Sequence, residues 1–293
     1  MKSQLSNVPS KKLPRVVAEA EAVREIVRTA QNDGKTVGFV PTMGALHAGH
    51  LSLVDAARAE CDLAVTSIFV NPTQFGPKED LSKYPRDLHR DLALLASRGC
   101  DLVFAPTVAE MYPAGYATSV DVGELGRELE GAFRPDHFRG VATVVLKLFQ
   151  IVPAEIAFFG RKDYQQTLVV QRMVADLNVP IEIRVLPTVR EADGLAMSSR
   201  NAYLSADDRR RALALSQSLR LAEALVRDGE RDVETIRGRM LVHLKTAGVD
   251  EVQYVAFVAE GTIAPVRTIE GPTTVAIAAK VGATRLIDNI RVG

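Results

Sequence analysis

Two histidines, His47 and His50, stand three residues apart in a position suited to phosphate chemistry. They follow an apolar run at 36–41 that is typical of a buried parallel strand, and they precede residues 51–58, which have helical spacing. The pair therefore lies at a strand-to-helix turn, where unpaired N–H groups and the helix dipole favour an anion. Imidazoles there add hydrogen bonds, and positive charge when protonated, to an α-phosphate under attack. The spacing predicts nucleotidyl transfer.

From spacing alone, two other interpretations of this pair stay open: a metal-binding pair and two helix-capping side chains. The metal-binding pair is the weaker of these two interpretations. The sequence has five histidines and two cysteines, with neither a His-Glu-x-x-His nor a paired Cys-x-x-Cys segment. We interpret Cys61 and Cys100 as buried structural thiols, because free cysteine is usually buried and two thiols make no disulfide framework.

Composition limits the class of protein. The 293 residues suffice for one large or two ordinary domains. Basic and acidic side chains balance at 36 each, which argues against broad nucleic-acid binding. No apolar stretch approaches the roughly 18 residues of a membrane span, and the polar start lacks a signal-peptide core. We therefore expect a cytoplasmic protein that binds neither nucleic acid nor membrane.

The first two-thirds of the sequence alternates helical and strand patterns, which predicts an α/β fold with a Rossmann-like parallel sheet covered by helices on both faces. The expected strands are 36–41, 63–70, 101–104, 156–159 and 181–185, and the expected helices are a stripe from Val16 to Ala30, then 51–58, 88–97, 141–151 and 164–177. After about residue 188 the pattern changes to helices at 206–227 and 233–246 and strands near 252–258, 273–279 and 284–290. We predict a Rossmann-like ligand-binding domain at 1–188 and a smaller α+β domain at 189–293 that acts as a lid.

Polar clusters follow the predicted strands at the edge where parallel sheets bind ligands. One is Asn71–Phe75, another is Gly160–Gln166, and Ser198–Arg200 lies near the predicted domain junction. Each cluster by itself is equally consistent with a turn or a helix cap. Together they supply a lysine and an arginine for phosphates, and amides for a small polar substrate. Neither a Gly-x-x-x-x-Gly-Lys-Ser/Thr loop nor a Gly-x-Gly-x-x-Gly segment is present.

The sequence closely resembles the pantoate–β-alanine ligase (pantothenate synthetase) family of the His-x-Gly-His nucleotidyltransferase superfamily. His-x-Gly-His marks only the superfamily, whereas Asn71-Pro72-x-Gln74-Phe75 and Asp193-Gly194-Leu195-Ala196-x-Ser198-Ser199-Arg200-Asn201 are far more specific. The resemblance covers nearly the whole chain and also includes Tyr84-Pro85-Arg86, Glu130-Gly131, Arg134-Pro135-x-His137-Phe138-x-Gly140-Val141, Lys162-Asp163-x-Gln165-Gln166 and Leu286-Ile287-Asp288-Asn289.

The resemblance implies ATP-dependent joining of (R)-pantoate to β-alanine, giving pantothenate, AMP and pyrophosphate. The pantoate carboxylate would attack the α-phosphate to form pantoyl adenylate, which the β-alanine amine would then attack. Neither step needs an enzyme nucleophile, so catalysis would come from positioning and electrostatics. The family also implies Mg²⁺ with the triphosphate, and a homodimer.

The resemblance also assigns site residues. His50 would be the proton donor, His47 its phosphate-contacting partner, Lys162 a phosphate contact, and Arg200 the group that neutralises departing pyrophosphate. The ATP site would comprise Met43, Gly44, Ala45, Leu46, His47, Ala48, Gly49, His50, Gly160, Arg161, Lys162, Asp163, Val189, Met197, Ser198, Ser199 and Arg200. Gln74 and Gln166 would hold pantoate, with Gln74 also near β-alanine. Asp91 is the carboxylate expected near Mg²⁺, although metal held by phosphates and water is an equal alternative.

One residue departs from the family pattern: Arg161 stands where the family commonly has Glu. We expect position 161 to contribute mainly its backbone to the ATP site, with the side chain directed elsewhere. Two rival functions stay open, a nucleotidyltransferase acting on a phosphorylated substrate and an inactive nucleotide-binding module. The first would favour more basic residues than the paired glutamines, and the second would lack His50, Lys162 or Ser-Ser-Arg.

Overall fold

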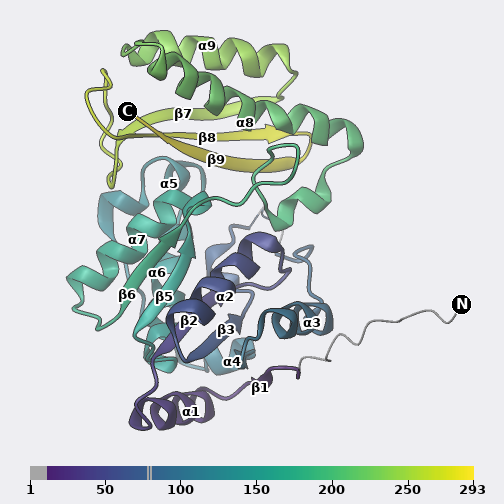
Figure 1. Ribbon diagram of the computed structural model, residues 1–293, viewed down its shortest axis with the longest axis vertical. Helices are drawn as coiled ribbons and strands as arrows, with labels where there is room; N and C mark the ends of the chain where they lie inside the picture. The colour runs from purple at the N-terminus through teal and green to yellow at the C-terminus, as the bar shows by residue number, and fades with distance from the viewer. Residues whose placement is uncertain (1–11, 78, 80) are drawn as a thin grey trace, which may run out of the picture.

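The computed structural model describes residues 12–77, 79 and 81–293, and these residues form two sheets (Figure 1). In the described residues the larger sheet has six parallel strands in the order β1-β4-β3-β2-β5-β6. Its strands are β1 (Arg15–Val17), β2 (Val37–Thr42), β3 (Leu63–Ile68), β4 (Leu102–Phe104), β5 (Ile156–Gly160) and β6 (Glu182–Leu186). The accompanying helices are α1 (Ala20–Asn32), α2 (Ala48–Glu60), α3 (Leu88–Arg98), α4 (Val108–Met111), α5 (Glu130–Phe133), α6 (His137–Ile151) and α7 (Tyr164–Asp176).

Alternating side chains of the strands build a core on each face of the parallel sheet. On β2, Phe39 packs with residues of α1, α6 and α7, whereas its neighbour Val40 packs with residues of α2 and α3. Both side chains are fully buried. The sheet is therefore the middle layer of three, as predicted from the alternating pattern.

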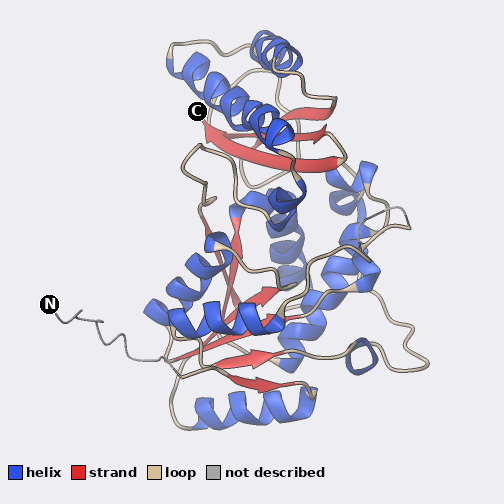
Figure 2. Ribbon diagram, turned by 90° about the vertical axis from the view of Figure 1, so that its right-hand side faces the viewer, coloured by secondary structure: helices blue, strands red, loops and turns tan. Residues whose placement is uncertain are grey.

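The C-terminal part of the chain forms a separate antiparallel sheet in the order β7-β8-β9. Its elements are β7 (Glu251–Ala259), β8 (Thr273–Val281) and β9 (Thr284–Val292), covered by α8 (Ala206–Arg227) and α9 (Val233–Thr246). Figure 2 shows these helices on the side of this sheet that faces away from the parallel sheet. Their apolar residues, with those of the strands, make a second core.

Helix α7 of the parallel-sheet part and strand β7 of the antiparallel sheet form a small apolar contact. Tyr164 and Leu168 of α7 pack against Val258 of β7. The face of the antiparallel sheet that α8 and α9 leave uncovered thus lies toward the parallel sheet, above the ends of β5 and β6 (Figure 1). Segment 187–205, which contains the 3-10 helix η4 (Ser199–Tyr203), connects the two parts.

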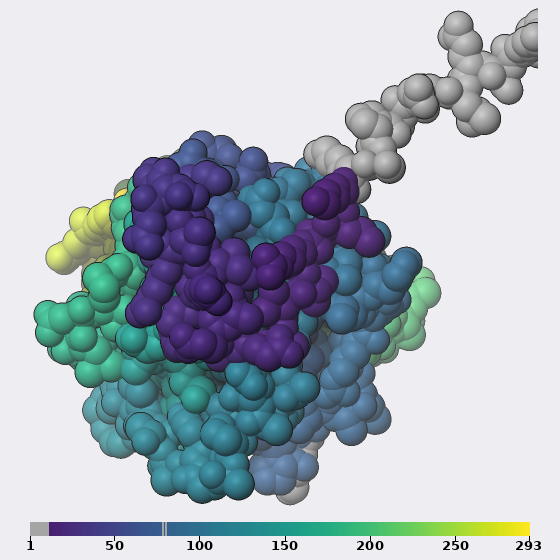
Figure 3. Space-filling view, turned by 90° about the horizontal axis from the view of Figure 1, so that it is seen from below, coloured from purple at the N-terminus to yellow at the C-terminus, as the bar shows by residue number. Residues whose placement is uncertain are grey.

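Sequence periodicity gave most of these elements with small errors at their ends. The predicted helical stripe is wrong at Val16, which lies in β1 and pairs with Val103 of β4. The successive β-branched residues Val16 and Val17 favour a strand, so α1 begins only at Ala20. Strand β1 and helix α1 lie at the end of the molecule opposite the antiparallel sheet (Figure 3).

Short elements without periodicity escaped prediction. These are α4, α5, β1 and the 3-10 helices η1 (Pro72–Gln74), η2 (Gly123–Gly126), η3 (Arg161–Asp163) and η4. Among the helices of the described residues, none is long and apolar enough to cross a membrane.

Candidate active site

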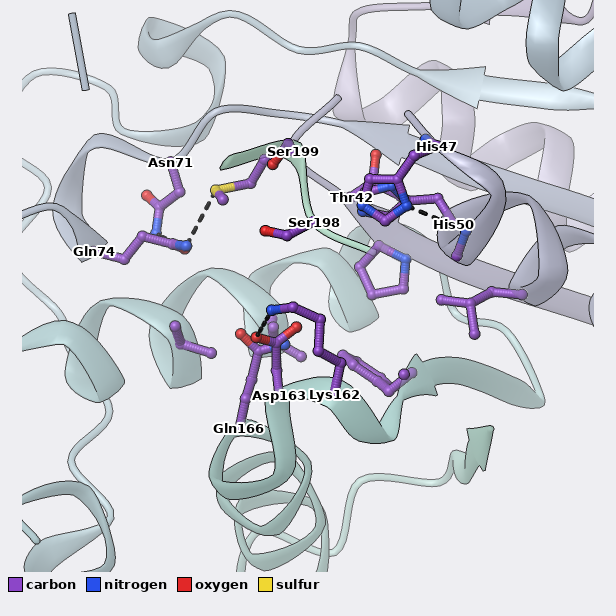
Figure 4. Close-up of a pocket in the computed structure, with 18 of the residues that line it drawn as sticks. Thr42, His47, His50, Asn71, Gln74, Lys162, Asp163, Gln166, Ser198 and Ser199 are labelled. Carbon is purple, nitrogen blue, oxygen red and sulfur yellow. Dashed lines mark hydrogen bonds and ion pairs between the residues drawn. The ribbon is translucent and has the colours of Figure 1, made fainter. Parts of the chain in front are cut away.

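A cavity lies at the carboxyl ends of the parallel strands, and the loops after β2, β3, β5 and β6 line it. The floor is apolar and comes from α6 and β5, through Val141, Val144, Val145, Leu148, Phe158 and Phe159. The polar groups are arranged around this floor (Figure 4). His47 and His50 lie on one side, Asn71 and Gln74 on the other, and Lys162, Asp163 and Gln166 at the N-terminal end of α7.

The two histidines cap α2. The His47 ring accepts the Gly49 backbone N–H at its Nδ1, at 3.2 Å, and the His50 Nδ1 accepts the His47 backbone N–H at 3.4 Å. The helix-capping interpretation is therefore confirmed, and it is compatible with a phosphate role. Because each Nδ1 accepts, a neutral ring carries its proton on Nε2. The ring centroids are 4.1 Å apart, and both rings line the cavity.

Both rings are neutral at neutral pH. Burial lowers the pKa of His47 to about 4, and the nearby Lys162 ammonium acts in the same direction. Burial also lowers the pKa of His50 to about 3, with His47 adding to the effect. At neutral pH the histidines thus offer hydrogen-bond donors, whereas the cationic side chains that line the cavity are Lys162, Arg200 and Arg134.

The loop before the histidines has a left-handed backbone at two successive residues. Gly44 has φ +79° and Ala45 has φ +50°. The buried carboxylate of Asp91 holds this loop, because its Oδ2 accepts the Ala45 N–H and its Oδ1 accepts the Leu46 N–H, each at 2.9 Å. Thr42 Oγ1 accepts the Gly44 N–H at 3.1 Å. This side of the cavity is therefore fixed by contacts within the parallel-sheet part.

The same geometry bears on the expected metal role of Asp91. Its side chain is 1% exposed, and Asp91 is not among the residues that line the cavity. Burial raises its pKa, which the two backbone N–H groups partly offset. In the structure, Asp91 lies behind the loop, and its carboxylate supports the backbone instead of facing the cavity.

Helix α6 supports the side of the cavity that carries the Asn71 and Gln74 amides. Gln74 is buried; its Oε1 accepts from Asn71 Nδ2 and its Nε2 contacts Met43 Sδ, each at 3.1 Å. The ring of His137 donates from Nδ1 to the Gln74 carbonyl at 2.9 Å. A Cβ on Gly140 would lie 2.8 Å from the Gln74 Cα, so only glycine permits this close approach of α6 to η1. These contacts fix where the Gln74 amide stands.

Lys162 lies in the short turn between β5 and α7. Its Nζ is 3.3 Å from Asp163 Oδ1. Burial opposes ionisation of Asp163, but Lys162, together with Arg200, holds the pKa of this carboxyl below its usual value. Gln166, one turn into α7, also lines the cavity.

The side chain of Arg161 points away from the cavity. Its guanidinium forms two hydrogen bonds to the Glu260 carboxylate, at 2.7 and 2.9 Å, and one to Thr274 Oγ1 at 2.8 Å. It also lies over the Tyr164 ring, 5.2 Å from the centroid. The departure from the family's Glu is thus accommodated by an ion pair to the C-terminal sheet, and the lining of the cavity does not include Arg161.

The remaining side of the cavity is formed by the start of η4 and its N-cap residue, Ser198. Ser198 Oγ accepts the Arg200 backbone N–H at 3.3 Å, and Ser199 Oγ lies 3.2 Å from the Tyr84 hydroxyl. Ser198, Ser199 and Arg200 all line the cavity. Ser198 and Ser199 therefore lie across the cavity from Lys162 (Figure 4).

Most residues predicted for the site do meet around this cavity: Met43, His47, Gly49, His50, Gln74, Gly160, Lys162, Asp163, Gln166, Val189, Met197, Ser198, Ser199 and Arg200. Others predicted for it do not line it: Gly44, Ala45, Leu46, Ala48, Asp91 and Arg161. The sequence reasoning did not assign Thr42, Asn71, Tyr84, Arg134, His137 or Thr188, which line it. Arg134 and His137 lie in a segment that resembles the family, and this resemblance could have pointed to them. They do not follow any predicted strand.

The comparisons with known proteins decide the family. The profile of the family described as pantoate-beta-alanine ligase matches residues 15–291. The chain belongs to this family. Pantothenate synthetase from Pelotomaculum thermopropionicum is 54% identical over 271 residues, covering 92% of this chain and 96% of the relative. The Moorella thermoacetica pantothenate synthetase is 55% identical over 269 residues, with 92% and 95% coverage.

Solved structures agree in fold. A crystal structure of pantothenate synthetase from Thermus thermophilus has a TM-score of 0.90 and 46% identity, covering 94% of this chain and 98% of the other. A pantoate-beta-alanine ligase from Francisella tularensis, described as complexed with beta-gamma ATP and beta-alanine, has a TM-score of 0.79 and 34% identity, with 94% and 97% coverage. The predicted fold and family are thus confirmed, and the chain is an AMP-forming pantoate–β-alanine ligase that uses ATP.

Proposed function

We propose that this cavity catalyses the condensation of (R)-pantoate with β-alanine through pantoyl adenylate, with the roles assigned below. One observation carries the proposal. The donors suited to a triphosphate and the amides suited to a small polar acid line a single cavity. An attack of the pantoate carboxylate on the α-phosphate needs both substrates in that space.

The triphosphate would lie between the histidines and the Lys162 turn. His47 and His50 would donate Nε2–H to phosphate oxygens as negative charge grows at the α-phosphate. Lys162 and Arg200 would supply positive charge, and the Ser198 and Ser199 hydroxyls further donors. Met43, Gly160 and Val189, with Asp163 and Met197, would contact the remainder of ATP. Since His50 is neutral at neutral pH, its proposed role as proton donor rests on Nε2–H.

Pantoate would lie over the apolar floor, with its polar groups on the amides of Gln74 and Gln166. Gln74 is already fixed by Asn71 and His137, so its amide needs no reorganisation to bind. In the second step the β-alanine amine would attack the acyl carbon, AMP would leave, and the amine would lose a proton. This step releases AMP and the amine proton, and it forms no covalent bond to the enzyme.

Mg²⁺ would be held mainly by the phosphates and water. Within the described residues, no group of three or more His, Cys, Asp or Glu side chains could hold a metal ion. Asp163 is a carboxylate that lines the cavity, while Asp91 lies behind the loop. When bound, the ion would neutralise triphosphate charge. We propose that Asp91 acts through the loop rather than as a ligand.

The predicted domain division at residue 188, with 189–293 as a lid, stays a prediction, supported by the separate cores of the two sheets. A homodimer and a cytoplasmic location are likewise proposals that rest on family membership.

The test is isotope transfer together with exchange. Pantoate labelled with ¹⁸O in its carboxylate should pass one labelled oxygen to AMP, and ATP–pyrophosphate exchange should require pantoate but not β-alanine. Unlabelled AMP would exclude the acyl adenylate. An exchange that needs β-alanine would indicate a concerted reaction of three substrates.

Replacing Gln74 by Ala tests the pantoate assignment. The KM for pantoate should rise about tenfold or more, since an oriented amide is lost, while ATP affinity should change little. A collapse of ATP affinity with an unchanged KM for pantoate would contradict the assignment.

A further inference from the structure

Two adjacent residues of β9, Asp288 and Asn289, contact both of the loops that face each other across the cavity. They belong to the segment Leu286–Asn289, which resembles the family but has no role in the site described above. Both side chains are buried, and neither residue belongs to the lining of the cavity.

Asn289 holds the Lys162 turn from behind. Its Nδ2 donates to the carbonyl oxygens of Arg161 and Lys162, each at 2.9 Å. Carbonyl oxygens only accept, so the amide nitrogen must face the turn. The buried Oδ1 of Asn289 has no hydrogen-bond partner in the described part of the chain. Both amide protons therefore go to the backbone that carries Lys162.

Asp288 holds the opposite loop. Its carboxylate accepts two hydrogen bonds from Arg190, at 2.7 and 3.0 Å, and its side chain is 3% exposed. Arg190 follows Val189, and the Val189 carbonyl accepts the Met197 N–H at 3.0 Å. Through Arg190, Asp288 thus reaches the hairpin that leads into Ser198.

We propose that Asp288 and Asn289 are positioning residues that set the separation between the Lys162 turn and the Val189–Met197 hairpin. One dipeptide on a rigid strand is bonded to both loops, so neither loop can shift alone without breaking a buried hydrogen bond. This inference rests on the proposed function, since it concerns where Lys162 stands relative to the triphosphate. Neither residue touches substrate in this assignment.

The first experiment uses Asn289→Asp, which keeps the shape and removes both donors. We expect kcat for pantoate-dependent ATP–pyrophosphate exchange to fall about ten- to a hundredfold, as for a misplaced catalytic group, with a smaller change in the KM for pantoate. Amide hydrogen exchange read by mass spectrometry should speed up in the peptide spanning 160–166. Asn289→Leu serves as the alternative if Asn289→Asp does not fold.

The decisive measurement is a double-mutant cycle with Lys162→Ala. If Asn289 acts through Lys162, then Asn289→Asp should change the residual exchange rate of Lys162→Ala by less than about twofold. A merely structural role predicts that the two losses multiply. That outcome, or unchanged protection of residues 160–166, would overturn the proposal.

Tyr254→Phe is the matched control. Its hydroxyl donates to Glu130 at 2.7 Å, a partly buried hydrogen bond between the same two parts of the molecule that involves neither loop. We expect it to lower the melting temperature and leave the exchange rate within about twofold. An equal loss of exchange in Tyr254→Phe would also count against the proposal. If the wild type shows no pantoate-dependent exchange, the proposed function fails instead, and the change in hydrogen exchange at 160–166 still tests the contact.

Discussion

The histidine side and the lysine side of the cavity differ in what holds them. His47 and His50 are set by the turn in which they lie, through capping bonds to their own backbone and through Asp91 beneath the loop. The turn that carries Lys162 is set by the C-terminal sheet, through Asn289 and the Arg161–Glu260 pair. One half of the proposed phosphate site is thus held within the parallel-sheet part, and the other is complete only when the two parts of the chain are assembled.

The largest effect should come from removing a donor on either side. We expect His50→Ala and Lys162→Ala each to slow ATP–pyrophosphate exchange by roughly a hundredfold or more, as for the loss of one preorganised donor. Exchange at saturating substrates measures this. An effect below tenfold on one side alone would show that only the other side stabilises the reacting phosphate.

Gly44→Ala should disturb the local side. A Cβ there would lie 3.0 Å from Asp91 Oδ2 and 3.1 Å from Ile68 Cγ2, on a backbone with φ +79°. We expect a loss of about 2–3 kcal/mol in the free energy of unfolding and roughly tenfold slower exchange.

The matched control for that variant is Gly34→Ala. Gly34 has φ +77°, and a Cβ there would meet nothing within 4 Å. It should cost only the backbone strain, about 1 kcal/mol, with normal exchange. Equal losses of exchange in the two variants would mean that the Asp91-supported loop does not set activity.

The buried histidines should also make stability depend on pH. The folded pKa values of His47 and His50 lie below the usual value, so the unfolded chain binds more protons between about pH 6.5 and 4. The stability that comes from keeping them neutral is present above pH 6.5 and falls as the pH drops. The slope is at most about 1.4 kcal/mol per pH unit for each ring. Urea unfolding of His50→Gln from pH 7 to 5 should show a shallower slope than wild type; an identical slope would contradict this prediction.

Arg161→Glu should have the smallest effect on catalysis. Because the side chain points to Glu260, the apparent ATP affinity should stay within about threefold of wild type, under roughly 0.7 kcal/mol. The variant should also be less stable, because the carboxylates of Glu260 and the new glutamate would meet where Arg161 now pairs with Glu260. We expect a loss of about 1–3 kcal/mol in the free energy of unfolding.

Restoring the pair in reversed order, with Arg161→Glu and Glu260→Arg together, should recover most of that stability. An ATP affinity more than tenfold weaker in Arg161→Glu would instead place the side chain in the phosphate site.

Local patterns in the sequence predict the histidine side well and the lysine side poorly. A strand, a turn and a helix start within 15 residues place His47 and His50 at a turn that favours an anion, although spacing alone leaves metal binding and helix capping open. The contact of Asn289 with the carbonyl of Lys162 joins residues 127 apart in sequence, and no periodicity encodes it. The polar cluster at Gly160–Gln166 and the family resemblance both indicated Lys162 itself, but neither indicated what holds it.

Asp91 and Val16 show two further limits of prediction from sequence patterns. A carboxylate near a phosphate site suggests a metal ligand, yet only the fold shows that backbone N–H groups occupy both oxygens of Asp91. Val16 fits a helical stripe by spacing, but pairing with β4 outweighs that spacing. At Val16 a tertiary partner decided the outcome, and at Asp91 the tertiary partners favour the supporting role proposed above.

The apolar floor formed by α6 and β5 affects how much ATP is consumed for each pantothenate formed. An acyl adenylate is open to attack by water as well as by an amine, and each hydrolysis would consume ATP without yielding product. Side chains such as Val144, Leu148 and Phe158 offer water no hydrogen bonds over this floor, where pantoate is proposed to lie. The partition of the intermediate between aminolysis and hydrolysis should therefore favour the amine, and ATP consumption should match pantothenate formation even when β-alanine is scarce.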